Sequence, residues 1–350
     1  MIPLIAGLTT LGLSLLLPFA VRPLLVKLGV VDIPSTRSSH DRPVIRGLGL
    51  AVLIAMLIGG GLSTLWLWGS GAPRWSLLAV VTATSLAAGL LGLSEDLQGL
   101  SVRTRSVLLL LIAALTMGTL VWMGSSFAEY WIAGTDLWIR LLLVLYGVLF
   151  ISSYINVANF MDGLNGISGF HGVVAGSAFA AAGVLSDQVW LVVAGSILAA
   201  GFLGFLPWNL SRPGAFLGDV GSYLLGGAIA VTSFAALMSG VPILATIGPM
   251  IIYFGDVGVT LVKRVRAGHR WDEPHKEHVY QRIQQSGTSH VAASAITAAF
   301  SLVASVLGLL SFFLPPLWWI ALLLAGLLLL GVYLRLPRLL AAPRRTATEG

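Results

Sequence analysis

The sequence contains no cysteine. This absence excludes disulfide frameworks, iron–sulfur clusters, thiolate nucleophiles and cysteine-ligated zinc sites. A metal ion bound to this chain must therefore use carboxylates or the 6 histidines as its protein ligands.

Charged residues are also scarce. Asp, Glu, Lys and Arg make up 10% of the 350 residues, whereas a soluble globular domain has about 25%. Hydrophobic residues make up 57%, and the mean hydropathy is +0.93. This composition leaves too little polar surface to cover a water-soluble particle of this size, so we expect the chain to lie in a lipid bilayer.

Long apolar stretches predict an all-α polytopic integral membrane protein. Crossing the hydrocarbon core takes about 20 mainly apolar residues. Eleven segments meet this criterion: residues 2–21, 47–68, 76–93, 106–124, 137–155, 168–184, 189–207, 220–238, 241–261, 291–313 and 316–336. We expect residues 1–336 to form one membrane domain and residues 337–350 to be a disordered basic tail.

The basic residues are distributed unevenly between the two sides that eleven spans define. One side carries 18 of the 20 Lys and Arg residues, and the other carries only Arg74 and Arg140. The positive-inside rule makes the basic side cytoplasmic and places the N-terminus outside. Because Arg22 and Lys27 follow the first span and no basic residue precedes it, we expect an anchor and not a cleaved signal peptide. The net charge of +6 thus reflects topology, and nucleic-acid binding is not expected.

Polar residues form five clusters on the expected inner side, where charged groups beside hydrocarbon are costly and therefore functional candidates. In the first loop, Arg37 and Arg46 stand among hydroxyl-bearing residues and suit a phosphate group. An ordinary basic inner loop is the alternative. In the second cluster, Glu95 and Asp96 precede Arg105, and simple solvation of a loop is the alternative.

The third cluster lies at the inner end of the fifth expected span. Asn156, Asn159 and Asp162 recur every three residues, which places them on one stripe of a helix. Gly163 and Gly166 then allow a ligand to approach the backbone closely. Three polar groups at this position are costly unless they bind something.

The fourth cluster contains Asn209 and, ten residues later, Asp219 at the start of the eighth expected span. A carboxylate at a helix N-terminus is also favoured by the helix dipole, so a structural cap is the alternative interpretation of Asp219.

The fifth cluster is a late basic loop. His275 and His278 share a helix face, Arg282 follows one turn later, and Arg264 precedes them. This arrangement indicates an anion site, although histidines are often structural. Asp256 adds an acid at the inner end of the ninth expected span. Oxygen ligands, arginines and histidines without thiols favour Mg²⁺, or alternatively Mn²⁺, together with a diphosphate.

Five ordered motifs carry a resemblance to a known family. They are DIPSTRSSH with RGLG, the acidic pair before GLS, NVANFMDGLNG, PWN with FLGDVGS, and HKEHVYQR. Along its whole length the chain resembles the bacterial polyprenyl-phosphate N-acetylhexosamine-1-phosphate transferases, the MraY/WecA superfamily of glycosyltransferase family 4. It is most similar to the WecA/WbpL-type branch, which initiates O-antigen synthesis.

The resemblance implies a Mg²⁺-dependent reaction at the cytoplasmic face of the bacterial inner membrane. UDP-N-acetylhexosamine and undecaprenyl phosphate would give undecaprenyl-diphospho-sugar and UMP. The two substrates and the lipid bilayer are then the expected partners, and a homodimer is compatible with this interpretation.

The resemblance also implies roles for single residues. Asp219 resembles the Mg²⁺ ligand, and the expected catalytic group is Glu95, Asp96, Asp162 and Asp219. Phe216 occupies the position at which the family stacks the uracil. The other expected substrate-binding residues are Asn156, Asn159, Asn209, Arg105, Asp256, Arg264, His275, His278, Arg282, Arg37 and Arg46.

Three departures from the family pattern qualify these roles. The usual Asp-Asp pair is Glu95-Asp96, the second aspartate of the DG motif is Asn165, and the run of histidines is opened to His-Lys-Glu-His. Asn165 therefore cannot be assigned a base or metal role. A phosphate monoester has a second pKa near 6 and is mostly dianionic at pH 7. We therefore expect Glu95 and Asp96 chiefly to position the lipid phosphate or the metal, and not to act as a strong base.

An ion-coupled secondary transporter or lipid flippase is the main alternative. Its acidic residues would gather near the bilayer midplane, whereas here they lie at inner helix ends and in loops. A scaffold without activity leaves the polar stripe unexplained. Because the triple-histidine pattern is absent, a UDP-MurNAc-pentapeptide substrate is disfavoured, and GlcNAc, FucNAc and QuiNAc derivatives all stay open.

Overall fold

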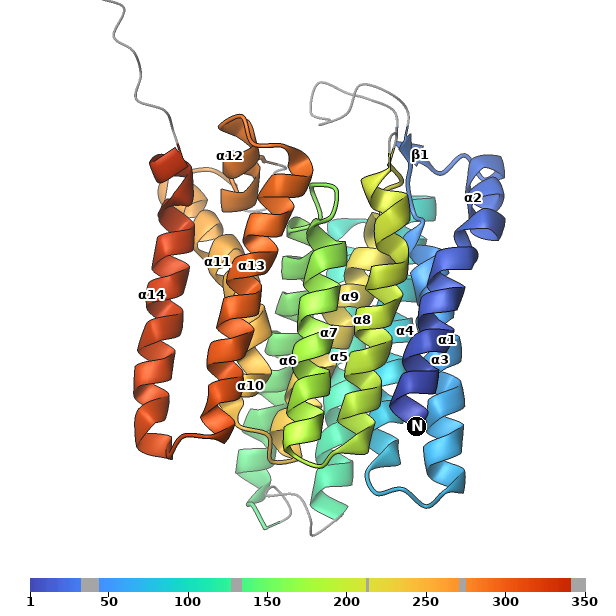
Figure 1. The fold of residues 1–350 in the computed structure, drawn as a ribbon, viewed down its shortest axis with the longest axis vertical. Coiled ribbons are helices and arrows are strands. Elements are labelled where there is room, and N and C mark those ends of the chain that lie inside the picture. Colours follow the sequence, from blue (N-terminus) through green and yellow to red (C-terminus); the bar gives the residue numbers. More distant parts are fainter. Residues whose placement is uncertain (33–43, 127–133, 212–213, 271–274, 341–350) are drawn as a thin grey trace, which may run out of the picture.

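Apolar helices make up most of the computed structural model, which describes residues 1–32, 44–126, 134–211, 214–270 and 275–340. Among these residues, ten helices are long and apolar enough to cross a membrane, or eleven if a bent N-terminal pair counts as one span. The helices run side by side in one bundle (Figure 1). The expected all-α polytopic membrane fold is confirmed.

The elements follow one another in the expected order. They are α1 (Ile2–Leu16), α2 (Pro18–Lys27), β1 (Val31–Asp32), β2 (Val44–Ile45), α3 (Gly49–Gly69), α4 (Trp75–Gln98), α5 (Val102–Ser126), α6 (Leu137–Phe160), α7 (Ile167–Leu185), α8 (Val189–Leu210), α9 (Gly218–Met238), α10 (Ile243–Ile247), η1 (Gly248–Met250), α11 (Ile251–Arg266), α12 (Val279–Gln285), α13 (His290–Leu309), η2 (Leu310–Phe312) and α14 (Pro316–Leu340). Every expected span from residue 47 onward coincides with a helix or a short series of helices. The expected start of the tail at residue 337 lies inside α14, because this helix continues to Leu340.

The first expected span, residues 2–21, is wrong as a single helix. The chain breaks between α1 and α2, whose axes differ by 41°. Pro18 is the physical reason, since it lacks a backbone N–H and its ring clashes with the preceding turn. At this break the indole Nε1 of Trp208 donates to the carbonyl oxygen of Leu15 over 3.0 Å.

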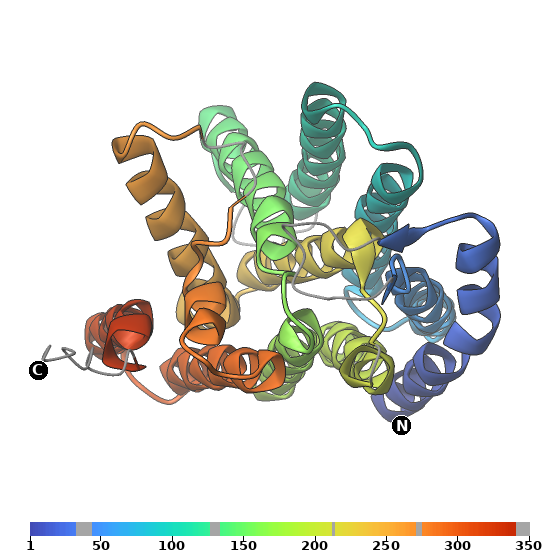
Figure 2. The ribbon, with the colours of Figure 1, turned by 90° about the horizontal axis from the view of Figure 1, so that it is seen from above.

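The helix α9 lies at the centre of the bundle, as Figure 2 shows from above. Inside the protein, 94% of its most apolar stretch is buried, against 11% for the peripheral α14. Glycines allow its neighbours to approach closely. A Cβ atom at Gly92 of α4 would lie 2.1 Å from the carbonyl oxygen of Asp219, and one at Gly49 of α3 would lie 2.5 Å from the Cα of Gly221. The first turn of α9 is therefore held tightly against α3 and α4.

Backbone pairing places the first loop beside the start of α9. The short strands β1 and β2 pair antiparallel. The amide of Phe216 then donates to the carbonyl of Ile45 over 2.8 Å, and the amide of Leu48 donates to the carbonyl of Phe216 over 3.1 Å. The segment that leads into α9 thus runs along the continuation of β2, so that Arg46 reaches the N-terminus of α9.

Tryptophans gather at the end of the bundle that lies opposite the first turn of α9. Indole rings favour the interface between a membrane and water. The tryptophans on helix segments near that end are Trp66, Trp68, Trp75, Trp122, Trp138, Trp190, Trp318 and Trp319. This belt is consistent with one end of the bundle at a membrane surface and the polar clusters at the other.

Candidate active site

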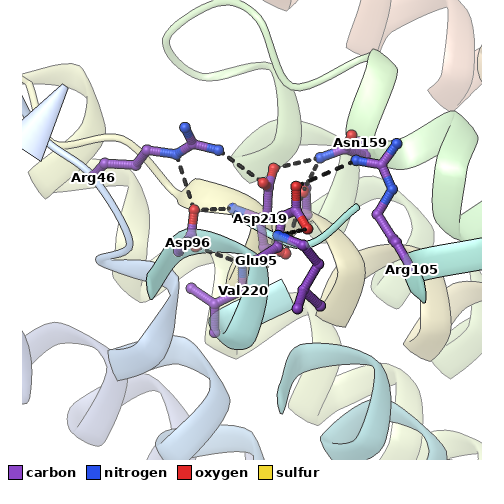
Figure 3. Close-up of polar contacts among 9 residues, drawn as sticks. Arg46, Glu95, Asp96, Arg105, Asn159, Asp219 and Val220 are labelled. Carbon is purple, nitrogen blue, oxygen red and sulfur yellow. Dashed lines mark hydrogen bonds and ion pairs between the residues drawn. The ribbon is translucent and has the colours of Figure 1, made fainter. Parts of the chain in front are cut away.

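Asp219 is the centre of a polar cluster in the first turn of α9 (Figure 3). Its Oδ2 pairs with Nη2 of Arg46 over 2.8 Å, and its Oδ1 accepts from Nδ2 of Asn159 over 2.7 Å. The same amide group of Asn159 lies 3.0 Å from Oγ of Ser222 and donates to it. The side chain of Asp219 is 16% exposed, so its carboxylate remains accessible to a ligand.

Asp96 lies beneath this cluster, at the end of α4. Its Oδ1 accepts from the backbone N–H of Asp219 over 3.1 Å, and its Oδ2 accepts from the N–H of Val220 over 2.9 Å. Nε of Arg46 pairs with Oδ1 of Asp96 over 2.9 Å, and the Asp96 side chain is fully buried. The first N–H groups of a helix have no partner within it and carry partial positive charge, so a carboxylate satisfies them well.

The structure thus assigns the capping of α9 to Asp96. The sequence left a cap open as the alternative role of Asp219, yet Asp219 makes no side-chain capping bond within α9. Because both oxygens of Asp96 are occupied, this residue fixes Asp219 and Arg46 and has no free lone pair facing solvent. The groups that Asp96 positions in the structure are thus protein groups, whereas from the sequence we expected the lipid phosphate or the metal.

Glu95 and Arg105 form a second, looser pair next to Asp219. Oε2 of Glu95 accepts from the amide of Leu100 over 3.1 Å, and its Oε1 lies 3.6 Å from Nη1 of Arg105. Figure 3 shows Arg46 and Arg105 reaching in from opposite sides of Asp219. Two guanidinium groups therefore flank one accessible carboxylate, an arrangement suited to a phosphate held between them.

The residues of the expected polar stripe on α6 have different surroundings. Asn159 joins the Asp219 cluster, whereas Nδ2 of Asn156 turns back to the carbonyl of Ser152 over 2.9 Å. Asp162 follows the end of α6, and its Oδ1 accepts from Oγ of Ser168 over 2.6 Å. Burial raises the pKa of Asp162 to about 7, with a smaller contribution from the neighbouring carboxylate of Asp219.

Asn209 holds the backbone around the site and does not point into it. Its Oδ1 accepts from the amide of Gly166, and its Nδ2 donates to the carbonyl of Ala215 over 2.9 Å. Nδ2 of Asn165 donates to the carbonyl of Asn209 over 2.9 Å. Phe216 lies one residue beyond Ala215, in the strand-like segment beside β2, and is partly exposed.

Asp256 hydrogen-bonds to the late basic loop around His278 and to the start of α12. It is fully buried, and its Oδ1 accepts from the amide of Val279 over 3.0 Å and lies 3.2 Å from Nδ1 of His278. Its Oδ2 accepts from the hydroxyl of Tyr333 over 2.9 Å and from the amide of Tyr280 over 3.4 Å. Asp256 is therefore saturated by protein groups and caps α12.

The remaining loop residues lie above Asp256. The His275 ring contacts the His278 ring at a centroid distance of 4.8 Å, and burial, together with His278 and Arg264, lowers the pKa of His275 to about 4. Arg264 is buried and donates to Glu277, while the side chain of Arg282 is exposed on α12. Nδ1 of His275 and Nε of Arg264 are buried without a hydrogen-bond partner among the described residues.

Two residues that the motifs did not single out connect the clusters. The hydroxyl of Tyr280 donates to the carbonyl of Phe160 over 3.1 Å, which joins α12 to the end of α6 just before Asp162. Tyr333 reaches Asp256 from α14. Tyr280 lies within the HVYQR motif, so the sequence could have indicated it. Tyr333 lies in a leucine-rich span, where nothing in the sequence points to a role. Arg37 lies outside the described residues.

Comparisons with known proteins identify the family of the chain. The family model described as glycosyl transferase family 4 matches residues 78–240. A Bacillus subtilis protein named a probable undecaprenyl-phosphate N-acetylglucosaminyl 1-phosphate transferase is 26% identical, covering 82% of this chain and 78% of its own. The decaprenyl-phosphate N-acetylglucosaminephosphotransferase of Mycolicibacterium smegmatis is 30% identical, covering 82% of this chain and 76% of its own. The chain belongs to the MraY/WecA superfamily.

A third relative extends this similarity. The undecaprenyl-phosphate alpha-N-acetylglucosaminyl 1-phosphate transferase of Thermotoga maritima is 28% identical over 80% of this chain and 81% of its own. The family match begins in α4 and ends just after α9, so it contains the Asp96 cap, the α6 stripe and Asp219.

The donor set of this superfamily member fits a divalent cation that is held jointly with a substrate. Among the described residues, no three His, Asp or Glu side chains are grouped as a complete protein site. Mg²⁺ commonly uses one or two carboxylates and completes its shell with water and substrate phosphates. Asp219, accessible and flanked by amide and guanidinium groups, offers one such carboxylate, whereas Asp96 is enclosed.

Proposed function

We propose that the protein transfers an N-acetylhexosamine 1-phosphate from a UDP-sugar to undecaprenyl phosphate, which yields undecaprenyl-diphospho-sugar and UMP. The observation that carries this proposal is the Asp219 cluster. It combines an accessible carboxylate, two flanking arginines and a capped helix N-terminus at one end of a membrane bundle. The names of the relatives support polyprenyl phosphate as the acceptor and GlcNAc as the first sugar to test.

In the proposed reaction, an oxygen of the lipid phosphate attacks the β-phosphorus of the UDP-sugar. The new O–Pβ bond forms as the bridging O–Pβ bond to UMP breaks, and UMP leaves with the bonding electron pair. A Mg²⁺ ion bound by Asp219 and the diphosphate would neutralise the charge that develops on the leaving group. Because the attacking phosphate is already mostly dianionic at pH 7, no strong general base is required.

The protein residues then have separate tasks. Arg46 and Arg105 approach from opposite sides and would hold phosphate oxygens. Asp96 fixes the first turn of α9, so that Asp219 and Arg46 are in place before substrate binds. Asn159 donates to Oδ1 of Asp219 and would hold this carboxylate in place for the metal and the phosphate.

The topology is part of the proposal. We place the Asp219 end of the bundle at the cytoplasmic face of a bacterial inner membrane, with the N-terminus outside, since the basic residues gather at that end. Initiation of O-antigen or another envelope polysaccharide is the corresponding biological role. The homodimer stays a prediction.

A panel of donors tests the proposal directly. Purified protein is incubated with undecaprenyl phosphate, Mg²⁺ and, one at a time, UDP-GlcNAc, UDP-FucNAc and UDP-QuiNAc, while UMP release is followed. We expect UMP release that depends on both lipid and donor. No UMP release with any of the donors, with lipid and metal present, would contradict the proposal and favour ion-coupled transport.

The transporter alternative has less support from the structure. Asp256 is the fully buried acid of α11, and its carboxylate is saturated by the loop and by α14. Glu95, Asp96 and Asp219 lie together at one end of the bundle, and Asp162, which follows the end of α6, interacts with the last two. A coupling-ion path would need acids near the middle of the spans.

A further inference from the structure

Tyr223 has a buried hydroxyl whose proton meets no acceptor among the described residues; the guanidinium of Arg105, which can only donate, is its polar neighbour. The residue is fully buried on α9, one helical turn after Asp219. Burying a polar group without a partner is unfavourable, and such groups are rare in folded proteins. The position therefore calls for an explanation.

The other fully buried tyrosines show that the fold normally satisfies this group. Tyr154 bonds the ring of His171, and Tyr253 donates to the carbonyl of Ile167. The remaining two, Tyr280 and Tyr333, donate to the carbonyl of Phe160 and to Asp256. Tyr223 is the exception among the five, and it is the one on the helix that carries Asp219.

The surroundings of the hydroxyl are the charged groups of the candidate active site. Residues four apart on a helix share a face, so Tyr223 lies on the same side of α9 as Asp219. The charges of Arg105, Asp219 and Glu95 all act on its hydroxyl. Glu95 is meanwhile engaged with the amide of Leu100 and with Arg105.

This environment favours a phosphate oxygen as the missing partner. A phenol O–H donates well to an anionic oxygen. Of the three charged neighbours, Arg105 is the one that attracts an anion, and it stands beside the accessible carboxylate of Asp219. Because Arg105 interacts directly with the Tyr223 hydroxyl, a phosphate that pairs with Arg105 would lie within reach of that hydroxyl.

We propose that the Tyr223 hydroxyl donates a hydrogen bond to a phosphate oxygen of a substrate held between Arg105 and Asp219. This inference rests on the proposed function, because it takes the phosphate from one of its two substrates. The phosphate belongs either to the polyprenyl phosphate or to the diphosphate of the donor, and the experiment below separates these sources.

The test is the Tyr223→Phe variant, which removes one oxygen and keeps the ring. The Michaelis constants for undecaprenyl phosphate and for the UDP-sugar are measured separately by UMP release. We expect one of them to rise about tenfold, equivalent to about 1.4 kcal/mol, since a hydrogen bond to a charged group is lost. The substrate whose constant rises supplies the phosphate.

A second readout tests the hydroxyl without turnover. The melting temperature of substrate-free Tyr223→Phe is expected to equal or exceed that of the wild type, because a buried hydroxyl whose proton has no acceptor is removed. Undecaprenyl phosphate or UDP-sugar alone should then raise the melting temperature of the variant less than that of the wild type. The matched control, Tyr253→Phe, breaks a bond within the protein and should lower the melting temperature without substrate.

The double variant Tyr223→Phe/Arg105→Lys adds a test of shared contact. If both side chains hold the same phosphate, their effects on the affected Michaelis constant should not multiply. Unchanged Michaelis constants and unchanged ligand protection in Tyr223→Phe would overturn the inference, as would a loss of substrate-free stability like that of the control. If substrate raises the melting temperature of the wild type but no UMP is released, only the proposed transfer reaction is contradicted. The difference in substrate-induced melting temperature between wild type and Tyr223→Phe would still decide the role of Tyr223.

Discussion

Replacing Asp96 by Asn distinguishes a positioning role from base catalysis. The substitution keeps the size of the side chain but removes its charge and one of its two acceptor oxygens. In the wild type these oxygens serve two backbone amides at 3.1 and 2.9 Å and the guanidinium of Arg46 at 2.9 Å, all in a fully buried position. In the variant, the NH₂ group of the Asn side chain would face one of these N–H donors and could not accept from it.

The expected cost follows from these contacts. A hydrogen bond to a charged group contributes about 1.5–3 kcal/mol, and an anion at a helix N-terminus in a partly buried geometry contributes up to about 2 kcal/mol. Since Asn retains one acceptor, we expect Asp96→Asn to lower the free energy of unfolding by about 2–4 kcal/mol. Displacement of Asp219 and Arg46 on the scale of 1 Å should reduce kcat by about 100-fold.

The pH profile provides the decisive measurement. If the lipid phosphate is the nucleophile in its dianionic form, the rate rises with pH through the second phosphate pKa near 6 in both wild type and variant. UMP release is followed from pH 5.5 to 9 at saturating substrate, with thermal unfolding measured in parallel. A control, Glu95→Gln, leaves the amides of α9 untouched and should change stability by less than 1 kcal/mol, as expected for a looser pair.

Two results would refute this reasoning. A variant rate that high pH restores fully would show that Asp96 supplies a basic group in the wild type. An unaltered melting temperature together with a large rate loss would show that the cap does not hold α9, so that Asp96 acts on the substrate and not on the fold.

Four further substitutions test the site and the packing and hydrogen bonds that surround it. Asp219→Asn should fold normally, because the side chain makes no capping bond, yet lose at least 100-fold in activity; turnover of this variant at low Mg²⁺ would contradict the metal assignment. Asn165→Asp should lower the free energy of unfolding by about 1–3 kcal/mol, since a carboxylate cannot donate to the carbonyl of Asn209 as the Asn amide does. An unchanged stability would show that this hydrogen bond does not account for Asn, in place of the family's Asp, at position 165. Gly92→Ala places a methyl group against the backbone of α9 and should cost about 1–3 kcal/mol together with activity, whereas Gly118→Ala, which meets open space, should cost neither. Because burial raises the pKa of Asp162 to about 7, the substrate-free protein should lose stability as pH rises from 4 toward 7, and Asp162→Asn should flatten that slope in melting curves; an identical slope in both proteins would exclude Asp162 as its source.

The membrane architecture was predictable because it depends on a simple quantity, the length of apolar segments. The break at Pro18 was missed although its cause is in the sequence. An apolar window of about 20 residues does not register that α1 ends at Leu16 and that Pro18 cannot continue it. Hydropathy locates a span, but backbone chemistry decides whether that span is one straight helix.

The contacts within the site were less predictable, because residue type alone does not tell which carboxylate caps and which one stays accessible. Asp96 and Asp219 are both acids at helix ends, and local sequence left a cap open as the alternative role of Asp219. Tertiary packing gives the capping role to Asp96, since the close approach at Gly92 brings α4 against the first turn of α9. Asp256 was likewise grouped with the substrate contacts, yet its burial beneath α12 engages both of its oxygens.

The balance of charge in the cluster supports the proposed role of a divalent cation. Three carboxylates, Glu95, Asp96 and Asp219, are offset by the two guanidinium groups of Arg46 and Arg105, which leaves a net charge of −1. A lipid phosphate dianion would be repelled by this charge in the absence of metal. A Mg²⁺ ion held by Asp219 would turn the net charge to +1, and Arg46, which also pairs with Asp96, would then share its guanidinium group with a phosphate. Because Asp219→Asn removes the carboxylate that Arg46 and the metal would share, a normal Mg²⁺ dependence of its residual turnover would contradict this charge balance.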